Sequence, residues 1–382
     1  MDYSAVIGQH HIKSHLQTSI AHGRIPHAQL FVGASGVGVL PMAMAYAKEL
    51  LCAHHSQGSV AHQKCAEKVE KLSHPDLHFV YPINKNEKVK KHWLSSHFLE
   101  EWRDFVMQHP YGSLFEWLQM LGIENKQGII NVDEAAEMMK KLSLKSYEGG
   151  VKVMIIWMAD KMNLESANKT LKLIEEPPDK TVLILITENE EDILPTIYSR
   201  CQKITFPLLA EADLQLALQE KVRLEAALAQ KIAHRAQGNY HNALRLLDEA
   251  GEDAHFEQWF VAWVRTAFKA KGNKKAINEL LHWSDQMAGL GRETQKKFLS
   301  YCLELFRQAL LENYSVNELV YFEPISEPFS LAKFAPFVHQ NNIFDISEAL
   351  NHAIYHVSRN GNGKIIFSDL SIQLTRFIHR KP

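Results

Sequence analysis

The chain has 382 residues, with 42 basic and 44 acidic side chains, so its formal net charge is −2. Apolar residues make up 46% and charged residues 23%, which excludes collagen-like, low-complexity and disordered chains. The near-zero charge also disfavours a protein that holds nucleic acid mainly through its overall electrostatic field. At roughly 150 residues per domain, this length predicts two or three domains.

The cysteines and the apolar runs indicate the cellular compartment in which the protein is expected. Cys52, Cys65, Cys201 and Cys302 lie too far apart for a disulfide framework, which favours a reducing environment. The first residues contain no signal-like apolar segment, and no apolar run approaches the ~18 residues of a membrane span. The sequence therefore predicts a cytoplasmic protein with no membrane contact.

Strands and helices alternate in the first half of the chain. Short apolar runs bounded by turn residues predict buried parallel strands at 30–32, 153–156 and 181–187. Helical patterns separate these runs, with predicted helices at 132–144 and 163–175. This alternation predicts an α/β domain with a parallel sheet and flanking helices.

Beyond residue 210 the apolar residues recur at helical spacing. Later helices are predicted at 256–268, 275–287, 292–311 and 343–357. The resulting domain prediction is an α/β domain at 1–208, a small helical lid domain at 209–251 and an all-helical C-terminal domain at 252–382.

Residues 84–128 interrupt the alternation. A basic cluster (Lys85, Lys88, Lys90 and Lys91) is followed by many aromatic residues, among them Trp93, Phe98, Trp102, Phe105, Tyr111, Phe115 and Trp117. This mixture is compatible with binding of single-stranded nucleic acid. Aromatic stripes more often pack in a core, so we favour a helical insertion whose aromatic side chains pack on their own domain.

A glycine-rich loop follows the first predicted strand. Gly33, Gly36 and Gly38 have the spacing of a phosphate-binding loop, G-x-x-x-x-G-K-[ST], up to its last two positions. In such a loop the lysine reaches the β- and γ-phosphates and the hydroxyl binds Mg²⁺. Val39 and Leu40 occupy these two positions, so the loop lacks a positive charge and a metal ligand.

The strand at 153–156 supports the same interpretation. It runs into Trp157 and Met158, where a nucleotide hydrolase carries the carboxylates that bind Mg²⁺ and orient water. ATP hydrolysis at this site is not expected. Two alternatives remain for the loop: a tight turn with no ligand, which we favour, or weak residual nucleotide binding.

Four sequence signatures in order resemble the bacterial clamp-loader subunits of the AAA+ family. They are Val6-Ile7-Gly8-Gln9 with Gly23-Arg24-Ile25-Pro26-His27-Ala28, then His74-Pro75-Asp76-Leu77, the segment 168–178 ending in Glu175-Glu176-Pro177-Pro178, and Ser199-Arg200-Cys201. The resemblance implies an AAA+ domain, a lid domain and a helical collar domain. The insertion at 84–128 departs from it.

The resemblance also assigns positions to nucleotide sensing. Thr187, at the end of the third predicted strand, falls where a polar sensor contacts the γ-phosphate. His241 falls where the ATP-hydrolysing subunits carry a second-domain arginine. Together with Val39 and Trp157, this pattern resembles the member of the family that does not hydrolyse ATP rather than the gamma/tau motor subunit.

Arg200 keeps the family residue. The resemblance implies an arginine finger that reaches, with Ser199 and Cys201 beside it, into the ATP site of a neighbouring subunit. A guanidinium offers fixed bidentate donors to the charge that develops on the γ-phosphoryl oxygens. The alternative is an arginine in a surface salt bridge.

The family often carries a four-cysteine zinc module after the first helix of its α/β domain. Cys52, His62 and Cys65 keep a plausible spacing for such a site, but Lys68 stands where the fourth ligand is expected. Structural zinc takes four nitrogen or sulfur ligands. His54, His55 or His74 are possible substitutes. We favour a relic loop, so neither zinc nor a nucleotide cofactor is expected.

These features predict a DNA replication protein that is catalytically inert by itself. Its implied partners are gamma/tau and delta subunits in a heteropentamer, and through that complex the sliding clamp and primer-template DNA. Two alternatives remain: an active AAA+ ATPase, and a DNA-binding module that uses Lys85 to Lys91.

Overall fold

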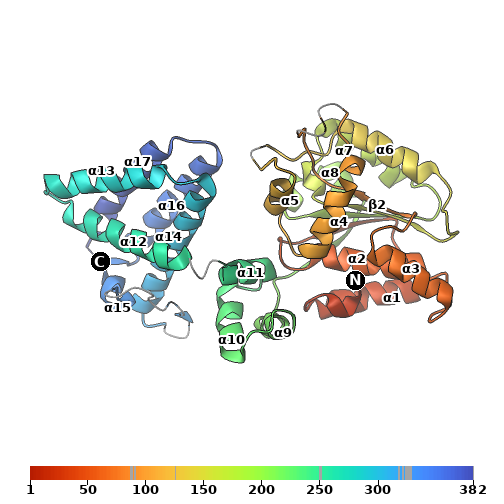
Figure 1. Ribbon diagram of the computed structural model, residues 1–382, viewed down its shortest axis with the longest axis horizontal. Helices are drawn as coiled ribbons and strands as arrows, with labels where there is room; N and C mark the ends of the chain where they lie inside the picture. Colours follow the sequence, from red (N-terminus) through yellow and green to blue (C-terminus); the bar gives the residue numbers. More distant parts are fainter. Residues whose placement is uncertain are drawn as a thin grey trace. The chain divides into compact units, whose positions relative to one another are not determined.

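The computed structural model describes residues 1–86, 89, 92–124, 126–248, 252–316, 319–320, 322 and 329–381. The chain forms two compact units, Met1–Arg245 and Leu246–Pro382 (Figure 1). The predicted boundary at 208/209, inside the first unit, stays a prediction. No helix within the described ranges is long and apolar enough to cross a lipid bilayer.

A five-stranded parallel sheet forms the centre of the first unit. Its strands are β1 (Ala28–Val32), β2 (Leu77–Val80), β3 (Lys152–Ile156), β4 (Thr181–Thr187) and β5 (Gln202–Thr205). They lie in the order β2-β3-β4-β1-β5, and every neighbouring pair is parallel. The three predicted strands are confirmed as β1, β3 and β4, all of whose residues are buried.

Side chains of the sheet alternate between two hydrophobic clusters. Phe31, Ile155 and Ile184 belong to one cluster, and their neighbours Leu30 and Leu185 belong to the other. This period of two follows from the pleat of a strand, and burial on both faces explains why the strands are continuously apolar. The predicted α/β fold is therefore confirmed.

Helices cover both faces of this sheet (Figure 1). The helices of the first unit are α1 (His10–Ala21), α2 (Val39–Cys52), α3 (Val60–Glu70), α4 (Leu99–Gln108), α5 (Leu114–Met120), α6 (Val132–Ser143), α7 (Leu164–Glu175), α8 (Pro195–Tyr198), α9 (Glu211–Lys221), α10 (Ala226–Arg235) and α11 (Tyr240–Asp248). The predicted helices α6 and α7 are confirmed. Asn131 and Asn163 cap their first turns by accepting backbone N–H groups three residues later.

The aromatic side chains of the insertion lie in the core, as the packing interpretation predicts. Trp102 on α4 and Trp117 on α5 are both completely buried. Trp102 stacks on Tyr81 at a ring separation of 4.1 Å and contacts Trp157 at 5.2 Å. The basic cluster falls largely outside the described residues, since of its members only Lys85 is described.

The second unit is helical over its described residues. It contains α12 (Glu252–Lys269), α13 (Lys274–Ala288), α14 (Arg292–Asn313), α15 (Leu331–Phe334), α16 (Ile343–Ser358) and α17 (Gly363–Phe377). The four helices predicted after residue 252 are confirmed as α12, α13, α14 and α16. Trp263 and Trp283 stack at 5.0 Å in its core, and the Trp263 indole N–H donates to Ser371 Oγ at 2.9 Å.

Truncation of Trp102 to alanine is expected to lower the free energy of unfolding of the first unit by about 3–5 kcal/mol, because it opens a cavity among aromatic rings. Denaturant unfolding followed by circular dichroism measures the effect. Met107→Ala, on the same helix, is the control. Its side chain is 64% exposed, so a change within about 0.5 kcal/mol is expected. Equal effects of the two substitutions would contradict the core position of α4.

Candidate functional site

The glycine-rich loop connects the end of β1 to the start of α2. Gly36 and Gly38 adopt φ angles of 84° and 96°, the left-handed region that favours glycine. A β-carbon on Gly36 would lie 2.0 Å from Asn239 Oδ1, so close approach also requires glycine there. The loop therefore has the strand-loop-helix setting expected of a phosphate-binding loop.

Val39 and Leu40 turn inward at the first turn of α2. Both side chains are buried. The Val39 Cγ2 atom lies 2.9 Å from where a β-carbon of Gly33 would stand, so the valine packs on the loop itself. An apolar side chain in this position offers no charge to a phosphate.

The insertion fills the space in front of the loop. The remaining hollow has a cavity volume of about 20 Å³. It is lined by the loop and the start of α2, together with Pro110, Tyr111, Gly112, Trp157, Met158, Ile186 and Glu188. That is room for about one water molecule. Pockets for small ligands measure roughly 300 to 1,000 Å³. The hollow beside the loop is therefore far smaller than a typical small-ligand pocket.

Tyr111 is the residue of the insertion that packs most directly against the glycine-rich loop. Its hydroxyl accepts a hydrogen bond from the Ile7 backbone N–H at 2.8 Å, and its ring lies 3.2 Å from the β-carbon position of Gly38. It also contacts the Tyr240 ring edge-on at 4.9 Å. Burial raises the pKa of the Tyr111 hydroxyl well above its ordinary value, so the phenol is neutral at physiological pH.

The segment before α11 closes the other side of the loop. The Asn239 side-chain amide donates to the Ser35 carbonyl at 2.6 Å, and the Tyr240 N–H donates to the Gly36 carbonyl at 3.0 Å. His241, the predicted sensor position, lies 3.4 Å from the Glu116 carboxylate on α5. Its ring therefore faces the insertion.

Trp157 and Met158 follow β3 and are both buried. Trp157 extends the aromatic cluster of the insertion. Thr187, at the end of β4, is completely buried, and its hydroxyl lies 3.0 Å from an Asp160 carboxylate oxygen. Sequence reasoning missed Asp160, which lies in a short 3-10 helix after β3, although a carboxylate two residues past Met158 was a visible signal. It missed Tyr111 as a site residue because no local pattern links it to the loop.

Arg200 follows α8, on the short connection to β5. Its side chain is 42% exposed, with Nε 2.8 Å from a Glu175 carboxylate oxygen and an NH1 donor 3.0 Å from the Thr196 carbonyl. The neighbouring Ser199 hydroxyl bonds to the same carbonyl at 3.3 Å. Burial raises the pKa of the adjacent Cys201 thiol to about 11, so Cys201 is a packed neutral thiol.

The zinc candidates are arranged differently from the prediction. Cys52 and Cys65 form a disulfide, so the expectation of unpaired cysteines is wrong for this pair. The reason is that α2 and α3 pack side by side, which brings the two Cα atoms to 5.8 Å despite 13 residues of separation. Among described residues, two groups have ligand atoms within 4.8 Å of one another: Cys65 with His74 and Glu148, and His54 with His55 and Glu148. His62 belongs to neither group.

The fold and the loop define a class of protein. The chain has a parallel α/β domain with a glycine-rich loop after its β1 strand, followed by helical segments, as the sequence predicts. A family model described as "DNA polymerase III, delta subunit" matches residues 8–210. The chain belongs to this family.

Individual relatives agree with the family assignment. The chain is 30% identical over 198 residues to the DNA polymerase III subunit delta' of Bacillus subtilis (strain 168), covering 52% of this chain and 47% of that protein. It is 26% identical over 253 residues to the DNA polymerase III subunit tau/gamma of Haemophilus influenzae. That match covers 65% of this chain and 30% of the tau/gamma protein. The chain thus matches less than half the length of either relative.

Among solved structures, a DNA polymerase III gamma subunit-related protein from Thermotoga maritima covers 95% of this chain and 99% of its own. It is 12% identical, with a TM-score of 0.40.

The Tyr111 hydroxyl is expected to contribute measurably to stability. Tyr111→Phe leaves the buried Ile7 N–H without its acceptor, which is expected to cost about 1–3 kcal/mol in the free energy of unfolding. Faster hydrogen exchange of the Ile7 amide should accompany the loss. Tyr147→Phe is the control, because that side chain is 81% exposed. Unchanged exchange at Ile7 would refute the described contact.

Proposed function

We propose that the chain is a delta-prime-like subunit of the DNA polymerase III clamp loader that does not hydrolyse ATP. In this role it assists the ATP-dependent loading of the sliding clamp on primed DNA. Membership of the DNA polymerase III delta subunit family supports the replication role. The proposed compartment is the cytoplasm.

One observation carries the proposal: the phosphate-loop site is filled by the chain's own side chains. Val39 and Leu40 replace the charged and hydroxyl residues of a working loop, and Trp157 and Met158 replace the carboxylates. Tyr111 packs against Gly38, and the hollow left beside the loop measures about 20 Å³. With apolar side chains at the lysine and hydroxyl positions, and with Trp157 and Met158 after β3, the site lacks the groups that bind phosphate and Mg²⁺ in a working hydrolase.

Arg200 is the residue that we propose acts on nucleotide, in the site of a neighbouring gamma/tau subunit. It is partly exposed, and Glu175 and the Thr196 carbonyl hold its Nε and NH1. These contacts orient the guanidinium before assembly. The side chain therefore loses less conformational entropy when it enters the neighbour's ATP site. An arginine presented in trans stabilises charge on the γ-phosphoryl oxygens as hydrolysis proceeds.

The proposed assembly is a heteropentamer with gamma/tau and delta subunits. The second unit would supply the collar contacts, and the chain would reach the sliding clamp and primer-template DNA through the complex. A gamma/tau-like ATPase is the second candidate, because gamma/tau proteins are among the relatives.

A nucleotide titration of the lone chain separates the two candidates. Fluorescent ATP with Mg²⁺ is expected to give no saturable binding below about 1 mM, the weak end of specific affinities. The chain alone is also expected to release no phosphate above background. Micromolar binding together with turnover would identify the chain as an active ATPase.

Substitution of Arg200 by alanine tests the proposed finger in a reconstituted complex. The rate of ATP hydrolysis at the neighbouring site is expected to fall by a factor of ~10³–10⁵. The ATPase rate of the whole complex then falls by the contribution of that one site. Assembly, followed by size-exclusion chromatography, should be unchanged.

Glu175→Gln is the matched control, because it breaks the same ion pair and leaves the guanidinium in place. It is expected to retain most of the ATPase activity. If both substitutions leave turnover unchanged, Arg200 is only a surface ion-pair residue.

A further inference from the structure

The zinc module implied by the family resemblance does not fit the residues of this chain. Its four positions are Cys52, His62, Cys65 and Lys68. A structural zinc ion needs four deprotonated nitrogen or sulfur ligands, and a lysine ammonium is not one. The two sulfur atoms are already joined to each other. The His62 ring belongs to no group of close ligand atoms among the described residues.

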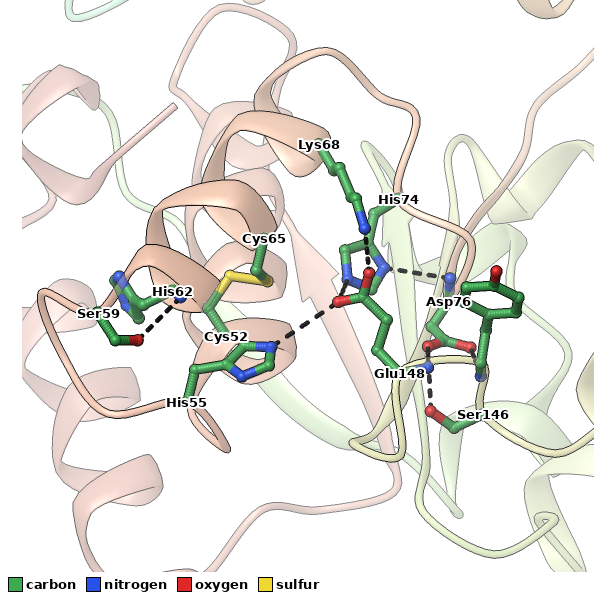
Figure 2. Close-up of polar contacts among 11 residues, drawn as sticks. Cys52, His55, Ser59, His62, Cys65, Lys68, His74, Asp76, Ser146 and Glu148 are labelled. Carbon is green, nitrogen blue, oxygen red and sulfur yellow. Dashed lines mark hydrogen bonds and ion pairs between the residues drawn. A yellow bond between two sulfur atoms is a disulfide. The ribbon is translucent and has the colours of Figure 1, made fainter.

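A lysine ammonium stands where the fourth ligand would be. Lys68 Nζ donates to Glu148 Oε1, and His74 Nε2 lies 3.1 Å from Oε2 of the same carboxylate (Figure 2). His55 Nε2 is 3.8 Å from that oxygen. The Glu148 carboxylate is therefore already paired with a cation, which a divalent metal would have to displace.

His74 has no lone pair left for a metal. Its Nδ1 atom accepts a hydrogen bond from the Asp76 backbone N–H at 3.1 Å, so the ring proton resides on Nε2, which donates to Glu148. The ring is almost completely buried. Both ring nitrogens are thus in use.

Asp76 fixes the loop that carries Glu148. Its carboxylate is buried and accepts hydrogen bonds from the Ser146 hydroxyl at 3.0 Å and from the backbone N–H groups of Tyr147 and Glu148 at 2.8 and 3.0 Å (Figure 2). These hydrogen bonds hold the loop just before β3 in place, so that Glu148 is positioned to pair with Lys68.

We propose that this chain replaces the structural metal of its family with a metal-free pin. The pin consists of the Cys52–Cys65 bond, which ties α3 to the end of α2, and of the Lys68–Glu148–His74 network, which ties α3 to the loop before β3. The consequence is that stability of the α/β domain depends on thiol redox state and not on zinc. This inference is independent of the proposed replication role.

The test uses the purified full chain in its disulfide form and after reduction with a dithiol. Reduction transfers two electrons and two protons from the dithiol, which becomes a cyclic disulfide, and gives the thiols of Cys52 and Cys65. Zinc content by mass spectrometry and the thermal midpoint are measured with and without one equivalent of zinc. The disulfide form is expected to hold no zinc. Reduction is expected to lower the midpoint by roughly 5–10 °C, with no recovery on adding zinc.

The opposite result would overturn the proposal. One zinc ion bound per reduced chain, with recovery of the midpoint, would mean that the cysteines, His74 and Glu148 form a metal site. A midpoint that does not respond to reduction would mean that the disulfide does not pin α3.

Two lysines on α3 provide the matched pair of variants. Lys68→Met removes the ammonium at Glu148 and is expected to lower the midpoint by a few degrees, still without zinc binding. Lys64→Met, on the same helix and exposed, is expected to leave the midpoint unchanged. Equal midpoints for the two variants would contradict the role of Lys68 in the pin.

Discussion

The hydrogen bond from the Ile7 amide to the Tyr111 hydroxyl joins the N-terminal segment to the insertion across the glycine-rich loop. Around this bond the Tyr111 ring covers Gly38, and Asn239 and Tyr240 occupy the backbone acceptors of Ser35 and Gly36. The loop is therefore held through its carbonyl oxygens and by ring packing, whereas a bound phosphate would accept hydrogen bonds from its backbone N–H groups. The loop thus differs from a working phosphate-binding loop in its packing as well as in its missing lysine.

The absence of carboxylates after β3 and the packing of the insertion are linked, because Trp157 contacts aromatic rings of the insertion. A charged acid at position 157 would be buried among Trp102 and Phe105, whose rings lie within 5.2 and 5.6 Å of Trp157. Burial of an unpaired charge there would be costly, whereas a tryptophan adds apolar contact area. The aromatic core of the insertion thus extends to the place where a hydrolase binds its metal. The Arg200 side chain, in contrast, is partly exposed at the surface.

Local patterns predicted much of this molecule. Continuous apolar runs identified β1, β3 and β4 because buried parallel strands bury both faces, and the aromatic stripe of the insertion correctly indicated packing. The site needed three-dimensional information, because Tyr111 meets Ile7 across 104 residues and Glu148 meets Lys68 across 80. The Cys52–Cys65 bond was likewise hidden, since spacing alone does not reveal that α2 and α3 pack together. The remaining assignment, Arg200 as a finger, rests on its motif and its exposed position.

The most direct test of the central claim is photolabelling of the assembled complex with an ATP analogue that carries its reactive group on the γ-phosphate. Labelled peptides of this chain are expected to contain Arg200, because that residue would face the neighbour's nucleotide. No label is expected on peptides that contain residues 33–40, because Tyr111 and Val39 pack against that loop. Label on the 33–40 peptide, with none near Arg200, would mean that this chain binds nucleotide itself and does not act through Arg200.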